Sequence, residues 1–132
     1  MAIFGIGASY GKEDVSKDFI GNNLVGIGHR VEDAPELYQF MRSLKVGDVV
    51  YIKSFSPRTR DISVKGIGLI KDDEGLRNEI VSCGRNVKWV STQKFRIRKP
   101  KEKNNVRNNS IYEEFHPEVQ RMILKRLYRE PV

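Results

Sequence analysis

The residues that could carry out catalysis are few, and their spacing matches no catalytic pattern. Cys83 is the only cysteine in the chain, and His29 and His116 are the only histidines. A thiol needs a nearby base to act as a nucleophile, and zinc needs ligands at short spacings; the sequence predicts neither. Carboxylates are plentiful, but none stands in a nuclease-like spacing with a lysine. We therefore predict a protein that is not an enzyme and uses no metal or cofactor.

Basic residues are the other chemically distinctive group. The chain has 24 Lys and Arg against 17 Asp and Glu, a net charge of +7. Six basic residues and one acidic residue lie between positions 96 and 107, so this segment carries +5 of that charge. It could follow a phosphate backbone or be a solvated loop. The predicted phosphate contacts are Lys53, Arg58, Arg60, Arg96, Arg98, Lys99 and Lys101.

The length and the hydropathy pattern limit the organisation of the chain. The 132 residues, 39% of them hydrophobic, predict one domain over 1–132 with a single core. No window approaches the roughly 18 apolar residues of a membrane span. The first ten residues lack the basic start and continuous apolar run of a signal peptide. We expect a cytoplasmic protein with no membrane partner, and the sequence does not indicate its oligomeric state.

Two segments have the apolar spacing of helices. After Asp33, a predicted N-cap, apolar residues follow at helical spacing up to Leu44, with a proline in the first turn. Pro117 opens a second helix with an apolar stripe. The stretch between positions 11 and 19 fits either one helical turn or a structured loop.

The remaining apolar segments are typical of strands. They lie at 2–8, at 24–28, in a hairpin over 47–70, and as two further segments between 85 and 99. This order predicts an α+β fold, with a small, curled, mostly antiparallel β-barrel flanked by two to three helices.

Several motifs resemble a known superfamily when they are taken in order. A helix precedes the Gly-Asp strand KVGDVVY at 45–51, a strand carries KGIGL at 65–69, and a late strand carries VKW at 87–89. This arrangement resembles PUA-like domains. It is most similar to EVE-type domains and to related modules of modification-dependent restriction proteins. The resemblance spans residues 2–127 and implies the PUA-like barrel. Several relatives have a tryptophan where this chain has His29.

The resemblance also implies a ligand and a site. Members of the superfamily bind RNA or DNA, and several hold a flipped, often modified base at the end of the barrel. A base must leave the stack before a protein can contact all of its edges. The ends of the first two strands and the hairpin would form the pocket. Its predicted residues are Ser9, Tyr10, Gly28, His29, Arg30, Phe55 and Trp89.

Each of these residues also has an ordinary structural interpretation. Gly28 could admit a base or simply let the strand bend. Trp89 could stack on a base, or it could share a core face with Val87. Tyr10 and Phe55 could be packed aromatics, whereas the polar residues could belong to turns or to the surface.

The predicted function is therefore a non-catalytic nucleic-acid-binding module that captures a base, modified or not. A first alternative is a binder or sponge of a free signalling nucleotide in the conflict between phages and bacterial defence. A second is a protein-binding inhibitor or adaptor that uses the sheet surface. The sequence does not distinguish RNA, DNA and free nucleotide.

Overall fold

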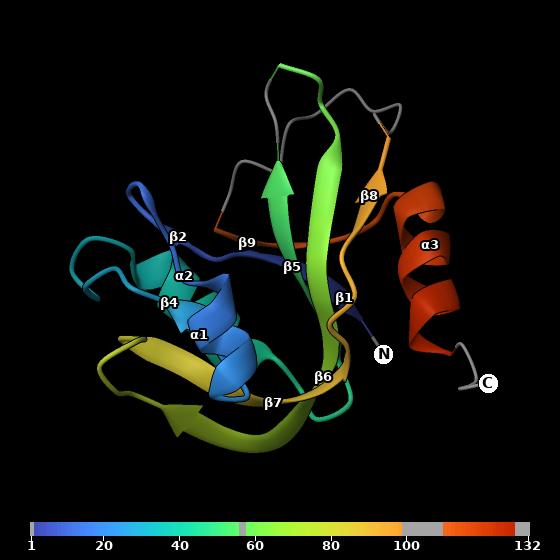
Figure 1. Cartoon of the computed structure of the whole chain (residues 1–132). Coiled ribbons are helices and arrows are strands. Elements are labelled where there is room, and N and C mark those ends of the chain that lie inside the picture. The colour runs from blue at the N-terminus through green and yellow to red at the C-terminus, as the bar shows by residue number, and fades with distance from the viewer. Residues whose placement is uncertain (1, 56–57, 99–109, 129–132) are drawn as a thin grey trace.

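The computed structural model shows an α+β fold built on one strongly curved mixed sheet (Figure 1). The structure describes residues 2–55, 58–98 and 110–128, without the side chain of Phe55. In these residues the sheet has seven strands, with the order β4-β7-β6-β5-β1-β9, and β8 pairs with β6. No pairing joins the outer strands β4 and β9. The α+β class is confirmed, whereas the closed barrel is not.

The strands of the main sheet match the predicted segments, and β9 is added to them. They are β1 (Ile3–Gly7), β4 (Leu24–Ile27), β5 (Val49–Phe55), β6 (Ile62–Leu76), β7 (Cys83–Ser91), β8 (Phe95–Ile97) and β9 (Ile111–Glu113). A separate two-stranded sheet pairs β2 (Ser9–Tyr10) with β3 (Glu13–Asp14). The hairpin over 47–70 is confirmed as β5 and β6, and β6 continues to Leu76. The undecided stretch between 11 and 19 contains β3 and the start of a helix.

The structure describes three helices, of which two were predicted. The predicted pair are α2 (Pro35–Ser43) and α3 (Pro117–Leu127), and α1 (Ser16–Gly21) is short. The predicted Asp33 cap is wrong, because the N-cap of α2 is Ala34 and no side chain bonds the helix start. The Asp33 carboxylate instead accepts a hydrogen bond from Arg30 Nε at 3.3 Å. In these residues no helix has the length and apolar character needed to span a membrane.

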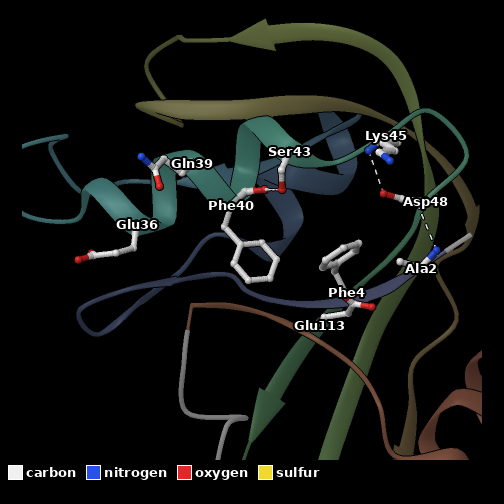
Figure 2. A pocket seen from close by; sticks show the side chains of 9 residues that line it. All are labelled: Ala2, Phe4, Glu36, Gln39, Phe40, Ser43, Lys45, Asp48 and Glu113. Carbon is white, nitrogen blue, oxygen red and sulfur yellow. Dashed lines mark hydrogen bonds between the residues drawn. The ribbon is translucent and has the colours of Figure 1, made fainter.

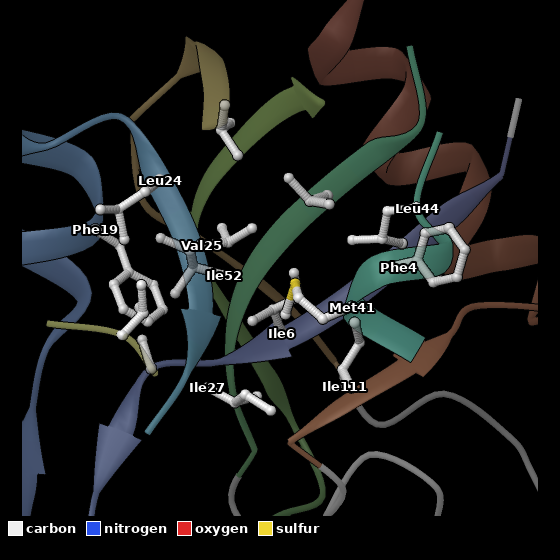
Figure 3. Close-up of a cluster of buried hydrophobic side chains, with 14 of the residues drawn as sticks. Phe4, Ile6, Phe19, Leu24, Val25, Ile27, Met41, Leu44, Ile52 and Ile111 are labelled. Atoms are coloured by element: carbon white, nitrogen blue, oxygen red, sulfur yellow. The ribbon is translucent and has the colours of Figure 1, made fainter. Parts of the chain in front are cut away.

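The central strand β5 is buried on both faces, as its continuous apolar run requires. Val50 and Ile52 join one core, which includes residues of α1 and α2 (Figure 3). Val49 and Tyr51 join the second core, which includes the buried face of α3. The alternation of side chains along the strand therefore divides the interior into two cores on opposite faces of the sheet.

The pairing of β1 with β5 is parallel, from Ile3 opposite Val49 to Gly7 opposite Lys53. The other pairings of the main sheet are antiparallel, as predicted. A parallel pair needs a long crossover. The crossover here holds the small hairpin, α1, β4 and α2. Of these elements, β4 joins the edge of the sheet beside β7, and α1 and α2 contribute to the core that contains Val50 and Ile52.

A buried arginine fixes the end of α2 against the sheet. Arg85 on β7 is 2% exposed, and its Nη1 donates to the carbonyl oxygens of Leu44 at 2.5 Å and Met41 at 3.2 Å. Its Nη2 donates to the carbonyl oxygen of Asp72 on β6 at 2.6 Å. The last carbonyls of a helix lack partners within the helix and carry partial negative charge. One guanidinium therefore joins α2, β6 and β7.

Replacing this arginine should destabilise the fold strongly. Arg85→Met leaves buried carbonyls without donors, and hydrogen bonds to a charged group contribute about 1.5 to 3 kcal/mol each. We expect the free energy of unfolding to fall by about 3 kcal/mol in urea titrations. Lys88→Met, at an exposed position on the same strand, is the control. Equal stability of the two variants would show that Arg85 does not hold the helix.

Candidate functional site

Two of the predicted pocket residues, Tyr10 and Gly28, pack against each other. The Tyr10 ring lies against Gly28, where a Cβ would come within 2.9 Å of the ring. Tyr10 Oη donates to the carbonyl oxygen of Ile80 at 2.6 Å, and the ring meets Phe19 edge-on, with the ring centroids 6.5 Å apart. An anchored tyrosine thus occupies the space where a side chain at position 28 would lie, and Gly28 itself stays exposed.

The other predicted pocket residues are dispersed. Trp89 is half-buried; its Nε1 donates to the carbonyl oxygen of Phe19 at 3.2 Å, and its indole packs over Gly66 and Gly68. Ser9 is exposed and donates to the carbonyl oxygen of Gly11. The side chain of Phe55 lies outside the described residues. His29 and Arg30 are exposed in the loop after β4.

One predicted pocket residue, Arg30, lines a cleft of about 520 Å³. This cleft lies at the end of β6 that contains Gly75 and Leu76. Arg42 from α2 and Arg77 after β6 line it as well, so three separate segments each contribute a guanidinium. Both of these arginines are exposed. We call this hollow the arginine cleft. Its other lining residues are Val31, Glu32, Tyr38, Gly75, Leu76, Ser82 and Cys83.

Hydrogen bonds hold the walls of the arginine cleft in place. The carbonyl oxygen of His29 accepts from Tyr38 Oη at 2.7 Å and from Ser82 Oγ at 2.6 Å. These bonds join α2, the loop after β4 and the start of β7. The Arg42 guanidinium lies over the Tyr38 ring, with its carbon 5.7 Å from the ring centroid. The backbone of His29 therefore helps to hold the walls of the arginine cleft together.

Cys83 lies in the wall of the arginine cleft and is 7% exposed. Burial raises the pKa of its thiol, and the neighbouring Arg42 only partly opposes that shift. The thiol is therefore protonated at neutral pH, and a protonated thiol is a poor nucleophile. Among the residues the structure describes, no three His, Cys, Asp or Glu side chains gather as a metal site.

A second hollow, of about 660 Å³, has the opposite charge. Figure 2 shows this hollow between α2 and β1, with Phe4 and Phe40 in its lining. The rings of Phe4 and Phe40 meet edge-on, and their centroids are 5.5 Å apart. Its lining includes three carboxylates and one lysine. The Asp48 carboxylate accepts from the backbone nitrogens of Lys45 and Ala2, at 2.8 and 3.2 Å, as expected for a Gly-Asp turn (Figure 2). This hollow would repel a phosphate. Its charged lining residues are Glu36, Lys45, Asp48 and Glu113.

A third hollow, of about 720 Å³, lies along the exposed face of α3. Its described lining residues are Arg121, Met122, Lys125 and Arg126, all from that helix. Arg126 is engaged by Phe95, with its guanidinium carbon 4.3 Å from the ring centroid. A basic face on one helix is common in soluble proteins. The arginine cleft is the better candidate, because separate elements converge on it.

Of the five predicted phosphate contacts that the structure describes, four lie at the opposite end of β6. Arg58 and Arg60 are exposed near the tip of the β5–β6 hairpin. Ile62 pairs with Ile97, so this register carries Arg96 and Arg98 to the same end of the sheet. We call these four residues the arginine tip. Arg96 lies 3.8 Å from the Asp61 carboxylate. Lys99 and Lys101 fall outside the described residues.

Lys53 is the exception, since it is 9% exposed and its ammonium lies 5.5 Å from the centre of the Tyr112 ring. It belongs to a buried polar network. Tyr51 Oη donates to the Glu114 carboxylate at 2.6 Å and lies 2.8 Å from Tyr112 Oη. Burial raises the pKa of Tyr51 well above its usual range. These side chains come from β5 and from the segment of β9 and Glu114, which flank β1 in the sheet, and their burial indicates a structural role.

Sequence reasoning missed Arg42 and Arg77 as site residues. Each stands alone among unrelated neighbours, and no motif connects them to Arg30. The one local signal was Tyr38 four residues before Arg42, because residues at this spacing share a helix face. No protein-family model matches the chain, and no curated protein sequence matches it significantly.

The anchored Tyr10 generates a pH prediction. Burial, with a smaller contribution from Asp18, raises its pKa to about 12. Between pH 10 and 12 the unfolded chain loses this proton while the folded chain keeps it, so the free energy of unfolding falls as pH rises. Because the side chain is only half-buried, we expect Tyr10 to account for about 1 kcal/mol of that fall.

Urea titrations at pH 9 and pH 11.5 measure this contribution. Tyr10→Phe should lose less stability over the interval than the unmodified protein does. Tyr128→Phe, at a residue that is 65% exposed, should behave like the unmodified protein. An identical loss in all three proteins would contradict the buried position of the Tyr10 hydroxyl.

Proposed function

We propose that the protein is a non-catalytic nucleic-acid-binding module that holds one nucleotide unit in the arginine cleft. The convergence of Arg30, Arg42 and Arg77 on a hollow of about 520 Å³ carries this proposal. Guanidinium groups bind phosphate oxygens through paired hydrogen bonds, and ligand pockets commonly measure about 300 to 1,000 Å³. The likeness to PUA-like and EVE-type modules, including their barrel and base capture, is part of the proposal.

The arginine tip would supply further phosphate contacts. Its four side chains are exposed, and they lie at the other end of the strand that leads to the arginine cleft. Contacts of this kind add affinity without sequence preference, and they weaken as salt rises because each neutralised phosphate releases counterions. The cleft would therefore fix one nucleotide, while the tip would hold the neighbouring backbone.

Two observations support a binding role over catalysis. The Cys83 thiol is protonated at neutral pH, because burial raises its pKa. The hydroxyl of Ser82 already donates to the carbonyl oxygens of Ile27 and His29. Neither side chain has an activated nucleophilic atom next to the arginines. The groups that remain available are cationic donors, which suit recognition of an anion.

The arginine cleft can be tested with Arg42→Ala/Arg77→Ala. Loss of two phosphate-binding guanidiniums should weaken binding of a fluorescent single-stranded oligonucleotide at least tenfold, since each charge-assisted bond contributes about 1.5 to 3 kcal/mol. Fluorescence anisotropy at fixed salt is the measurement. Lys17→Ala/Lys88→Ala removes the same charge from exposed positions outside the cleft and should have a small effect. Equal affinity for both double variants would rule out the cleft as the nucleotide site.

The arginine tip distinguishes nucleic acid from a free nucleotide. Arg58→Ala/Arg98→Ala should lower oligonucleotide affinity and reduce the dependence of log affinity on log salt by about two. Binding of a nucleoside monophosphate, measured by calorimetry, should not change. If this variant leaves oligonucleotide binding and its salt dependence intact, the free nucleotide becomes the better candidate. If neither class of ligand binds the unmodified protein, the proposed function is wrong.

A further inference from the structure

The arginine cleft holds more positive charge than one internal phosphate of a nucleic acid can balance. Three guanidiniums line it, and among its described lining residues Glu32 is the one carboxylate. Arg30 also pairs with Asp33 at 3.3 Å, although both side chains are largely exposed. The structure shows no ion pair for Arg42 or Arg77 within the described part of the chain. Two full positive charges are therefore available to a ligand.

The number of available arginine charges indicates how much negative charge a ligand of the arginine cleft should carry. An internal phosphodiester carries one negative charge and has two oxygens free for hydrogen bonds. A terminal phosphate carries about 1.5 to 2 negative charges at neutral pH and presents three strong acceptor oxygens. A terminal phosphate, with more charge and one more free oxygen, balances two or three arginine forks better than an internal phosphodiester does. The charge in the cleft thus favours a phosphate at the end of a molecule.

The remaining walls suit the body of a nucleotide. Val31 is 45% exposed and Leu76 is half-buried, so apolar surface lies beside the arginines. Gly75 leaves room, since a Cβ built on it would meet no atom within 4 Å. The Arg42 guanidinium already lies over one aromatic ring and could stack on a base by the same interaction. A sugar and a base would therefore have surface to contact next to the phosphate.

We propose that the arginine cleft binds the terminal phosphate of a nucleotide, either at the end of a nucleic-acid strand or in a free nucleoside phosphate. This inference rests on the proposed function and narrows it. It specifies that the nucleotide held in the cleft is one that carries a terminal phosphate. The two sources share the same chemistry, and the experiment separates them.

The test compares three forms of one oligonucleotide, with a 5′-phosphate, with a 3′-phosphate and with neither. At fixed salt we expect one phosphorylated end to bind at least tenfold more tightly than the unphosphorylated strand. A nucleoside monophosphate should compete with that strand if free nucleotides are also ligands, whereas the parent nucleoside should not. Failure of the monophosphate to compete would assign the site to strand ends.

Two variants locate the effect in the arginine cleft. Gly75→Leu should fill the cleft without a clash and abolish the preference for the phosphorylated end. Gly21→Leu is the matched control, because Gly21 is exposed at the end of α1 and its Cβ position also meets no atom within 4 Å. Thermal unfolding of both variants shows whether they remain folded. Arg42→Ala/Arg77→Ala should remove the preference by loss of charge.

Cys83 offers an independent readout. It is the only cysteine in the chain, so the mass added by a small alkylating reagent reports on this cleft alone. Binding of the phosphorylated strand should slow that reaction, and the unphosphorylated strand should slow it less.

The outcomes separate the two proposals. Equal, tight binding of all three strands would overturn the terminal-phosphate inference and leave nucleic-acid binding in place. A preference for one end that survives in Gly75→Leu would overturn the cleft as its location. Absence of binding by every strand and nucleotide would overturn the proposed function itself.

Discussion

The buried guanidinium of Arg85 is the contact on which the candidate site depends most. It donates to carbonyl oxygens at the end of α2 and to one on β6, while its own backbone belongs to β7. These three elements carry or flank Arg42, Arg77 and Cys83 in the arginine cleft. No buried carboxylate accompanies this arginine among the contacts described, so helix-end carbonyls supply the compensating negative charge. The hydrogen bonds from Arg85 to these carbonyl oxygens offset the free-energy cost of burying its charge, and they hold α2, β6 and β7 together.

A second set of bonds completes the frame at the other side of the cleft. Tyr38 and Ser82 both donate to the carbonyl oxygen of His29, which fixes the loop that carries Arg30. The exposed arginines thus stand on backbone that is held by buried or half-buried groups. Rigid support of this kind reduces the ordering cost when a ligand binds. This rigid backbone support also explains why arginine side chains, which are long and flexible, can still define a binding site.

The sequence predicted the elements better than it predicted their assembly. Both longer helices followed from apolar spacing, and Pro35 and Pro117 begin them as expected. The hairpin over 47–70 was predicted as well, and its first strand is buried at the centre of the sheet. The parallel pairing of β1 with β5 was missed, because residue spacing along one strand does not identify its partner. Asp33 failed as a cap because the N-cap position of α2 is Ala34, and the Asp33 carboxylate accepts a hydrogen bond from Arg30.

The site was harder to predict, for a related reason. Tyr10 and Gly28 were both singled out, but local sequence could not show that one packs against the other. Arg85 looked like any basic residue in a strand, since nothing in its neighbours indicates that it is buried. Arg30, Arg42 and Arg77 meet only after α2 folds back over the end of the sheet. Contacts between distant segments depend on the topology of the fold, and the pattern of residues in a single sequence gives little information about topology.

The length of β6 sets a scale for any ligand that touches both of its ends. The strand runs from Ile62, beside the arginine tip, to Leu76, beside the arginine cleft. At about 3.3 Å per residue its contour is at most about 46 Å, and irregular pairing near Gly68 and between Ile70 and Gly75 accompanies its curvature. Stacked nucleotides advance by about 3.4 Å each. A strand of about 14 stacked nucleotides is therefore long enough to contact the arginine tip and the arginine cleft at once. A longer strand would bind more tightly only because it offers more positions at which binding can begin.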